Sequence, residues 1–337
     1  MKYGIWAPIF GGWLRNIADE NMTADFDYVS KVVKSAEDLG YEKVLVAELN
    51  LNDIKGTDQA VMEAWTTSAA LAAVTNKIEI LAAVRPGFHN PAITAKMAAN
   101  IDLISGGRFT LNVVSAWWEE EARQYGAIFT AHNERYDRTE EFIQVLKGLW
   151  SEANFSFDGK FYQLKDVSLS PKPKNQPTLY AGGESPRGKE AIVNHCDSYV
   201  MHGGTVEEIQ AKISEMKQLR TKNSEPFKQF GMAAYVICRD TEEEAQAELA
   251  RITKVEDMSG YAGYKDFTTK SKLEQVVALQ DYSVSNRGLR PNLIGTPAQI
   301  AAKIKEYEAV GLDFLLLQSS PQHEEIKRFA EQVMPLV

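Results

Sequence analysis

Two adjacent glycines separate an apolar run from a helical pattern in AGGESPRGKE, residues 181–190. A turn of this kind aims backbone N–H groups and the positive end of a helix dipole at one point, which suits a phosphate or another anion. The candidate ligands are Gly182, Gly183, Glu184 and Ser185. A strand-to-helix turn that needs glycine only for its backbone conformation has the same sequence, so spacing alone leaves both interpretations open.

A second group of polar side chains lies in HNERYDRTEEF, where His132, Arg135 and Tyr136 precede an amphipathic stretch. An imidazole, a guanidinium and a phenol at the start of a helix can complete a phosphate site through charge-assisted hydrogen bonds. The same side chains can instead cap and brace the helix. On spacing alone, the structural role is favoured.

Further candidates stand at the ends of apolar runs. Asn112 interrupts the run 109–114, a position that strands disfavour, and its amide offers both a donor and an acceptor. Arg85 could clamp an anionic or polar substrate, or form a surface ion pair. The acidic run 119–121 is typical of a solvated helix face. Trp6 and Tyr235 also lie at strand ends, where packing in the core is the alternative to a site role.

These candidates are positioned by short apolar runs that alternate with helical patterns. The runs are continuous, as expected of parallel strands buried on both faces. The predicted strands are 3–9, 43–47, 78–84, 109–114, 178–181, 198–201, 231–238 and 314–317, and the predicted helices are 26–39, 61–74, 91–104, 136–150, 186–194, 206–219, 242–253 and 324–333. About eight such units favour an α/β fold of the TIM (β/α)8 barrel type. A doubly wound open sheet needs fewer strands and usually a GxGxxG turn.

Three insertions are expected in this barrel, near residues 115–135, 151–174 and 253–291. The second contains FSFDGKFYQL, in which Asp-Gly between two alternating runs indicates a β-hairpin. The third is polar and weakly periodic, and we expect it on the face where barrel loops emerge. Because no low-complexity linker divides the chain, a single domain over residues 1–337 is predicted.

Charge and composition restrict the function. Lys and Arg number 37 against 46 Asp and Glu, a net charge of −9, which argues against a nucleic-acid partner. No apolar run predicts a membrane helix, and the start of the chain reads poorly as a signal peptide. Cys196 and Cys238 show neither metal-ligand nor disulfide-framework spacing, and the five histidines form no HExxH pattern. We expect a cytoplasmic protein with no metal and no membrane partner.

The chain resembles the bacterial luciferase-like, flavin-dependent monooxygenase family in motifs that keep their order over nearly its whole length. They are SGGRFTLNVVSAWWEEEARQYG, HNERYDRTEEFIQVLKGLW, FDGKFYQLKDVSLSPKP, LYAGGES and LIGTPAQIAAKIKEYEAVGLDFLLL. The sulfur-scavenging branch, which acts on dimethylsulfone or alkanesulfonates, is the most similar. The resemblance implies a TIM barrel with a long insertion, a homodimer or homotetramer, O2 as co-substrate, and reduced FMN (FMNH2) from a separate NAD(P)H-dependent FMN reductase.

The resemblance also implies roles for the candidate residues. The phosphate of FMN would lie between Tyr136 and the Gly182–Ser185 turn, with His132 among the cofactor-binding residues, while Asn112 would face the isoalloxazine ring. Glu121 matches an acidic position of its motif. The candidate catalytic residues are Asn112, Arg85, Glu121, Tyr235 and Trp6.

Departures from the alkanesulfonate enzymes bear on the substrate. Ala233 and Tyr235 stand where those enzymes carry Arg and His, and Ser320 matches one of their tyrosines. Arg85 is then the remaining cation expected at a strand end, and burying a sulfonate against a single partner is unfavourable. A neutral sulfone suits the site better. The expected reaction is oxidation of a small organosulfur compound with C–S bond cleavage.

Two other functions remain open. One is oxidative opening of a nitrogen heterocycle of the pyrimidine type with the same cofactor, because the GGW stretch with Trp13 resembles enzymes of that kind. The other is a non-catalytic flavin-binding protein of the same fold.

Overall fold

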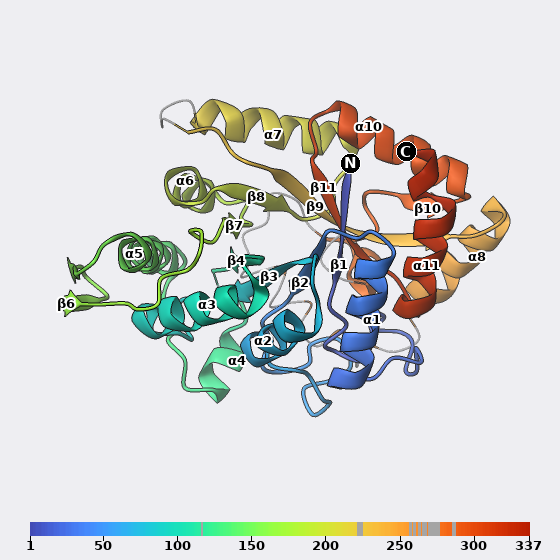
Figure 1. The fold of residues 1–337 in the computed structure, drawn as a ribbon. Coiled ribbons are helices and arrows are strands. Elements are labelled where there is room, and N and C mark those ends of the chain that lie inside the picture. Colours follow the sequence, from blue (N-terminus) through green and yellow to red (C-terminus); the bar gives the residue numbers. More distant parts are fainter. Residues whose placement is uncertain are drawn as a thin grey trace.

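The computed structural model describes residues 1–337 except 116, 221–224, 256–257, 259–260, 262–263, 265–267, 269–276 and 285–287. In the described part, eight parallel strands close into a barrel that helices surround (Figure 1). In ring order the strands are β1 (Lys2–Trp6), β2 (Lys43–Val46), β3 (Glu79–Val84), β4 (Phe109–Val113), β7 (Leu179–Ala181), β8 (Ser198–Met201), β9 (Phe230–Cys238) and β11 (Phe314–Gln318). Pairing of β8 with β9 closes the ring, so the predicted TIM barrel is confirmed.

A helix follows each of these strands. In the same order the helices are α1 (Phe26–Asp38), α2 (Ala64–Val74), α3 (Pro91–Ser105), α5 (His132–Ser151), α6 (Pro186–His195), α7 (Val206–Arg220), α8 (Glu242–Thr253) and α11 (Gln322–Gln332). Several of these helices begin at a residue whose side chain caps them. Asn90, for example, caps α3. Within the described residues, none of the helices has both the length and the apolar character needed to span a bilayer.

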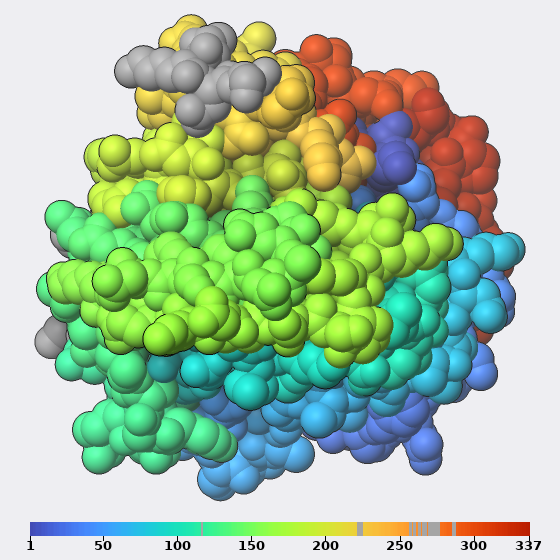
Figure 2. Space-filling model, turned by 60° about the vertical axis from the view of Figure 1, so that its left-hand side comes forward, coloured from blue at the N-terminus to red at the C-terminus, as the bar shows by residue number. Residues whose placement is uncertain are grey.

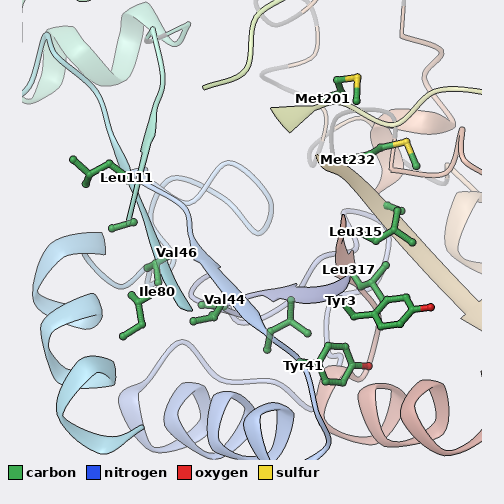
Figure 3. Close-up of a cluster of buried hydrophobic side chains, with 14 of the residues drawn as sticks. Tyr3, Tyr41, Val44, Val46, Ile80, Leu111, Met201, Met232, Leu315 and Leu317 are labelled. Carbon is green, nitrogen blue, oxygen red and sulfur yellow. The ribbon is translucent and has the colours of Figure 1, made fainter. Parts of the chain in front are cut away.

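Alternation of side chains along each strand produces two buried layers. Val44, Val46 and Ile80 belong to the large cluster between the strands and the helices, part of which Figure 3 shows. Leu45 and Leu81 belong to a separate, smaller cluster with residues of β7 and β11. Both faces of a strand are therefore buried, which explains why the strands read as continuous apolar runs.

Polar side chains fill the barrel at the amino-terminal ends of its strands. Lys43, at the start of β2, forms an ion pair with Glu79 and donates to the Tyr180 hydroxyl at 3.0 Å. The Thr110 hydroxyl donates to Glu79 at 2.9 Å. The Lys43 ammonium also lies 5.1 Å from the centre of the Phe314 ring. This packed network leaves the carboxyl ends of the strands as the place for a cavity.

The insertions agree with the sequence where the structure describes them. Residues 151–174 contain the predicted hairpin, formed by the antiparallel strands β5 (Phe155–Asp158) and β6 (Gln163–Val167). In Figure 2 the lime-green segment that includes this region forms a band across the surface. Residues 115–135 contain a short helix, α4 (Glu119–Gln124). Much of the predicted insertion 253–291 lies outside the described residues.

Several element boundaries differ from the predictions. The first strand ends at Trp6 rather than residue 9, and α5 begins at His132, four residues early, because its polar first turn has no apolar periodicity. The pair β10 (Leu293–Gly295) and α10 (Pro297–Ala309) was not among the predicted elements. Among the described strands, β10 pairs with β9 alone and lies outside the ring, and three residues are too few to show a period.

Candidate active site

A cavity opens at the carboxyl ends of the barrel strands. The space that it encloses, open mouth included, is about 1510 Å³. Its wall carries side chains that follow β1, β2, β3, β4, β7, β8 and β11. Most of the candidate residues line it, namely Trp6, Arg85, Asn112, His132, Tyr136, Gly182, Gly183 and Glu184. The structure thus brings together groups that the sequence separates by more than 170 positions.

At one end of the cavity, Tyr136 of α5 meets the glycine turn after β7. A Cβ atom on Gly183 would lie 3.1 Å from the Tyr136 hydroxyl, and one on Gly188 only 2.7 Å from it. Ser185 does not line the cavity, but it caps α6 by accepting a hydrogen bond of 3.1 Å from the Gly188 N–H. Tyr199 fixes the turn by donating to the Gly183 carbonyl at 2.8 Å. The two halves of the expected phosphate site therefore adjoin.

The electrostatics of this end favour an anion. Burial raises the pKa of the Tyr136 hydroxyl, which therefore stays protonated and can donate at neutral pH. Arg135 also lines the cavity, with its Nε atom buried and without a hydrogen-bond partner in the described part of the chain. Its guanidinium donates to the Thr130 carbonyl at 2.7 Å and lies 4.5 Å from the centre of the Phe129 ring. The His132 ring contacts the Tyr136 ring at a centroid distance of 5.2 Å.

Three ion pairs hold this end of the cavity in place. The Glu184 carboxylate lies beside the turn, and Lys212 of α7 pairs with it, so its charge opposes a bound anion less. Arg187 of α6 bonds to Asp137 and Glu140 of α5, each at 2.7 Å. These two contacts join the helix that carries Tyr136 to the helix that begins at the glycine turn.

Several polar atoms of the cavity-lining residues are buried without a hydrogen-bond partner among the described residues. Two of them are the acceptor Oδ1 of Asn112 and the donor Nε1 of Trp6. Buried polar atoms are normally hydrogen-bonded, so an unpaired donor and an unpaired acceptor in one cavity point to a ligand that satisfies them. A heterocycle with polar groups on its edge, such as an isoalloxazine ring, fits this pair. Together with the anion-binding end, these residues fit a flavin mononucleotide.

Arg85 lies at the cavity wall but is only 2% exposed. Its guanidinium forms two bonds to Glu121, one of them 3.1 Å from Nη2 to Oε1, and stacks 3.9 Å from the centre of the Phe88 ring. Glu121 is 0% exposed and does not line the cavity. The expectation that residues 119–121 form a solvated face is therefore wrong for Glu121, whose carboxylate is buried against Arg85.

Tyr235, like Glu121 and Ser185, does not line the cavity. It is 1% exposed and packs in the main hydrophobic cluster, although the β9–β11 register puts it beside Gln318, which does line the cavity. Its backbone N–H donates to the Gly288 carbonyl at 2.7 Å. The Tyr235 side chain therefore lies outside the cavity wall of the described structure, and its place among the catalytic residues stays a prediction from the sequence.

Sequence reasoning also missed several lining residues. Arg15, Glu48, His202 and Gln318 all line the cavity, so Arg85 is not its sole cation. Three of these four stand at a strand's carboxyl end, where barrel proteins keep their functional groups. Glu48 follows the run KVLVA, His202 follows SYVM and Gln318 ends FLLLQ. That position was the signal that could have found them.

A closed parallel barrel with a polar cavity at the carboxyl ends of its strands is typical of a TIM-barrel enzyme. Residues 1–313 match the family model of the luciferase-like monooxygenases. The chain belongs to this family.

Two curated relatives share its full length. An FMNH2-dependent dimethylsulfone monooxygenase of Pseudomonas putida is 36% identical, with 100% of this chain and 95% of the relative covered. A protein of the same name from Pseudomonas fluorescens (strain Pf0-1) is 34% identical and is 94% covered.

Solved structures show the same fold. A riboflavin lyase, crystallised with modified FMN and riboflavin, superposes with a TM-score of 0.86 at 20% identity, covering 100% of this chain and 91% of the other. EDTA monooxygenase from Chelativorans sp. BNC1 gives a TM-score of 0.82 at 20% identity, covering 100% and 93%. At these identities the likeness concerns the fold alone.

Proposed function

We propose that this protein is an FMNH2-dependent monooxygenase that uses O2 to cleave a C–S bond in a small, neutral organosulfur compound of the dimethylsulfone type. The observation that carries the proposal is the match at 36% identity over the full chain to a relative named for that activity. The cavity supports it, because an anion-binding end adjoins a buried space with unsatisfied polar atoms.

FMN is the cofactor that these residues fit. The Tyr136 hydroxyl, the Arg135 guanidinium and the backbone of the Gly182–Ser185 turn would hold the phosphate, and Asn112 would meet the ring system. Reduced FMN, when bound, supplies the electrons that activate O2. The residues of this chain bind and orient the two reactants and exclude water from the reacting centre.

Aromatic side chains form the wall that would keep water out. The Trp6 and Trp13 rings meet edge to face at 6.3 Å between centroids, and Phe10 meets Trp13 at 6.0 Å. Trp13 is 0% exposed, and its indole N–H donates to Gln322 of α11 at 2.5 Å, which fixes the ring. Such a wall suits the methyl groups of a sulfone, while N–H groups of Arg85 can donate to its oxygens.

Other features of the proposal follow from the family and the surface. We infer that a separate NAD(P)H-dependent FMN reductase delivers the reduced flavin, as the name of the relatives implies. A homodimer or homotetramer is supported by Ile93, Leu103 and Ile104, which α3 exposes to solvent. A single domain over residues 1–337 and a cytoplasmic location stay predictions from the sequence.

The test combines the protein with an FMN reductase, NADH, O2 and one of three compounds: dimethylsulfone, methanesulfonate or uracil. Cleavage of dimethylsulfone places one atom of O2 in the products methanesulfinate and formaldehyde, and the other leaves as water. We expect formaldehyde release with the highest kcat/KM for dimethylsulfone. A preference for methanesulfonate would overturn the neutral substrate, and ring-opened uracil would favour the heterocycle. Hydrogen peroxide alone with all three would indicate a flavin-binding protein that does not oxygenate them.

A further inference from the structure

Four ionisable side chains from three successive βα units, which follow β2, β3 and β4, meet at the cavity wall. We call Arg85, Glu121, Glu48 and His89 the Arg85 cluster. Glu48 lies with its Oε2 atom 3.5 Å from Nε of Arg85, and its Oε1 atom contacts Nε2 of His89. Arg85 and Glu48 both line the cavity, and the side chains of these two and of Glu121 are at most 5% exposed.

The charges of the Arg85 cluster do not favour an anion. One guanidinium stands against two carboxylates, so the cluster carries a net negative charge when His89 is neutral and no net charge when it is protonated. A further anion in the cavity therefore meets no unbalanced positive charge here, and buried like charges repel strongly because the local dielectric is low. This differs from the expectation that Arg85 offers a free cation to the substrate.

The guanidinium nevertheless keeps hydrogen-bonding capacity. Arginine has five N–H donors, of which two bond to Glu121; Nε lies 3.5 Å from Oε2 of Glu48 without a hydrogen bond between them. Two further N–H groups remain that no hydrogen bond to Glu121 or Glu48 occupies. Arg85 can thus donate to a sulfonyl oxygen while its charge is already matched, which suits a neutral ligand.

We propose that Glu48 is a specificity-determining residue that makes the substrate end of the cavity reject anions, so that a neutral tetrahedral sulfone is bound in preference to a sulfonate. The inference rests on the proposed function for its substrate class. Charge selection is a property of binding, however, and can be measured without turnover. Nothing else in the mechanism assigns a role to Glu48.

The other cations of the cavity are consistent with this role. Arg15 forms an ion pair of 3.0 Å with Asp53 and stacks 4.0 Å from the centre of the Tyr282 ring, so its charge is matched as well. Arg135 has no carboxylate ion pair among the described residues, but it lies beside Tyr136 at the phosphate end. The positive charge of the cavity is therefore concentrated at the cofactor's anionic group.

Dimethylsulfone and methanesulfonate are a matched pair of probes, because they differ by the exchange of one methyl group for a charged oxygen. The variant Glu48→Gln removes one negative charge and keeps the size and a polar contact to His89. The control Glu243→Gln removes the same charge from an exposed position of α8. Dissociation constants are measured by calorimetry, with and without bound FMN.

We expect Glu48→Gln to tighten methanesulfonate binding by at least about tenfold, or about 1.4 kcal/mol, and to change dimethylsulfone binding by less than about threefold. Glu243→Gln is expected to change neither. An unchanged dissociation constant for methanesulfonate in a folded, FMN-binding Glu48→Gln protein would overturn the proposal, and so would an equal gain for both probes.

If Glu48→Gln does not fold, Glu121→Gln provides a second test, because it removes the other carboxylate of the Arg85 cluster. The same selective gain for methanesulfonate is expected there, and its absence refutes the proposal. Failure of the proposed function is a separate outcome. If the wild-type protein binds the two probes with different affinities but oxidises neither, the charge selection stands and the proposed reaction is refuted.

Discussion

The phosphate end of the cavity makes a sharp prediction for Tyr136→Phe. This change removes one hydroxyl and leaves the ring, which contacts His132 at 5.2 Å between centroids. The hydroxyl lies at the glycine turn, so close that a Cβ atom on Gly188 would be 2.7 Å from it. Because its pKa is raised by burial, the wild-type group is a neutral donor throughout the physiological range.

The size of the effect follows from the charge of the acceptor. A hydrogen bond to a charged group contributes about 1.5–3 kcal/mol, which corresponds to a roughly 10- to 150-fold change in dissociation constant. We therefore expect Tyr136→Phe to weaken FMN binding by that factor. Riboflavin lacks the phosphate, so its affinity should be weaker than that of FMN in the wild type and nearly unchanged by the substitution.

The assay is a fluorescence titration of both flavins against three proteins: wild type, Tyr136→Phe and a matched control, Tyr162→Phe. Tyr162 belongs to the hairpin region, donates to the Pro86 carbonyl at 3.3 Å and does not line the cavity. Only Tyr136→Phe should narrow the difference between FMN and riboflavin. Equal losses for the two flavins, or wild-type affinity for both, would show that the phosphate does not bind at this turn.

Three further predictions concern the ring end, the barrel interior and alkaline pH. Asn112→Ala should keep the fold but release more hydrogen peroxide per product formed, and normal coupling would remove Asn112 from the site. Lys43→Met leaves Glu79 without its buried partner, so urea unfolding should show a loss of about 3 kcal/mol while the FMN dissociation constant stays the same. Burial raises the pKa of the Cys196 thiol from 9.0 to about 12, so the unfolded state loses this proton first and stability falls as pH rises above 9. At pH near 10.5 this difference in pKa lowers the free energy of unfolding by about 2 kcal/mol. In Cys196→Ala, the free energy of unfolding should therefore decline less steeply with pH.

The barrel could be predicted because its strands are buried on both faces. The run KVLV, which is the whole of β2, does not alternate between apolar and polar residues as a half-exposed strand would. Glycine or polar residues lie close to each of its ends. The strand β10 is too short to show such an apolar run. It pairs with the last residues of β9 and is not a member of the ring. Helix α10 carried a readable start in Pro297 and the capping box of Thr296 with Gln299, so it could have been predicted.

The site could be predicted only in part, because spacing along the chain does not reveal partners from other βα units. Tyr136 and the glycine turn each had a plain structural alternative, and the contact between them exists only once β4 and β7 are neighbours in the barrel. Glu121 looked like one of three solvated carboxylates, yet it reaches back 36 positions to Arg85. Glu48 is bound to His89, 41 positions away.

These distant pairings decide what the cavity can bind, and a count of charges along the chain does not. The whole chain carries a net charge of −9, but Arg135, Tyr136 and the start of α6 make one end of the cavity favourable to an anion. At the Arg85 cluster the guanidinium is matched by two carboxylates. We therefore propose that a ligand with one anionic group and one neutral ring binds with its phosphate at Tyr136. The space beside Arg85 is then left for a second, uncharged reactant.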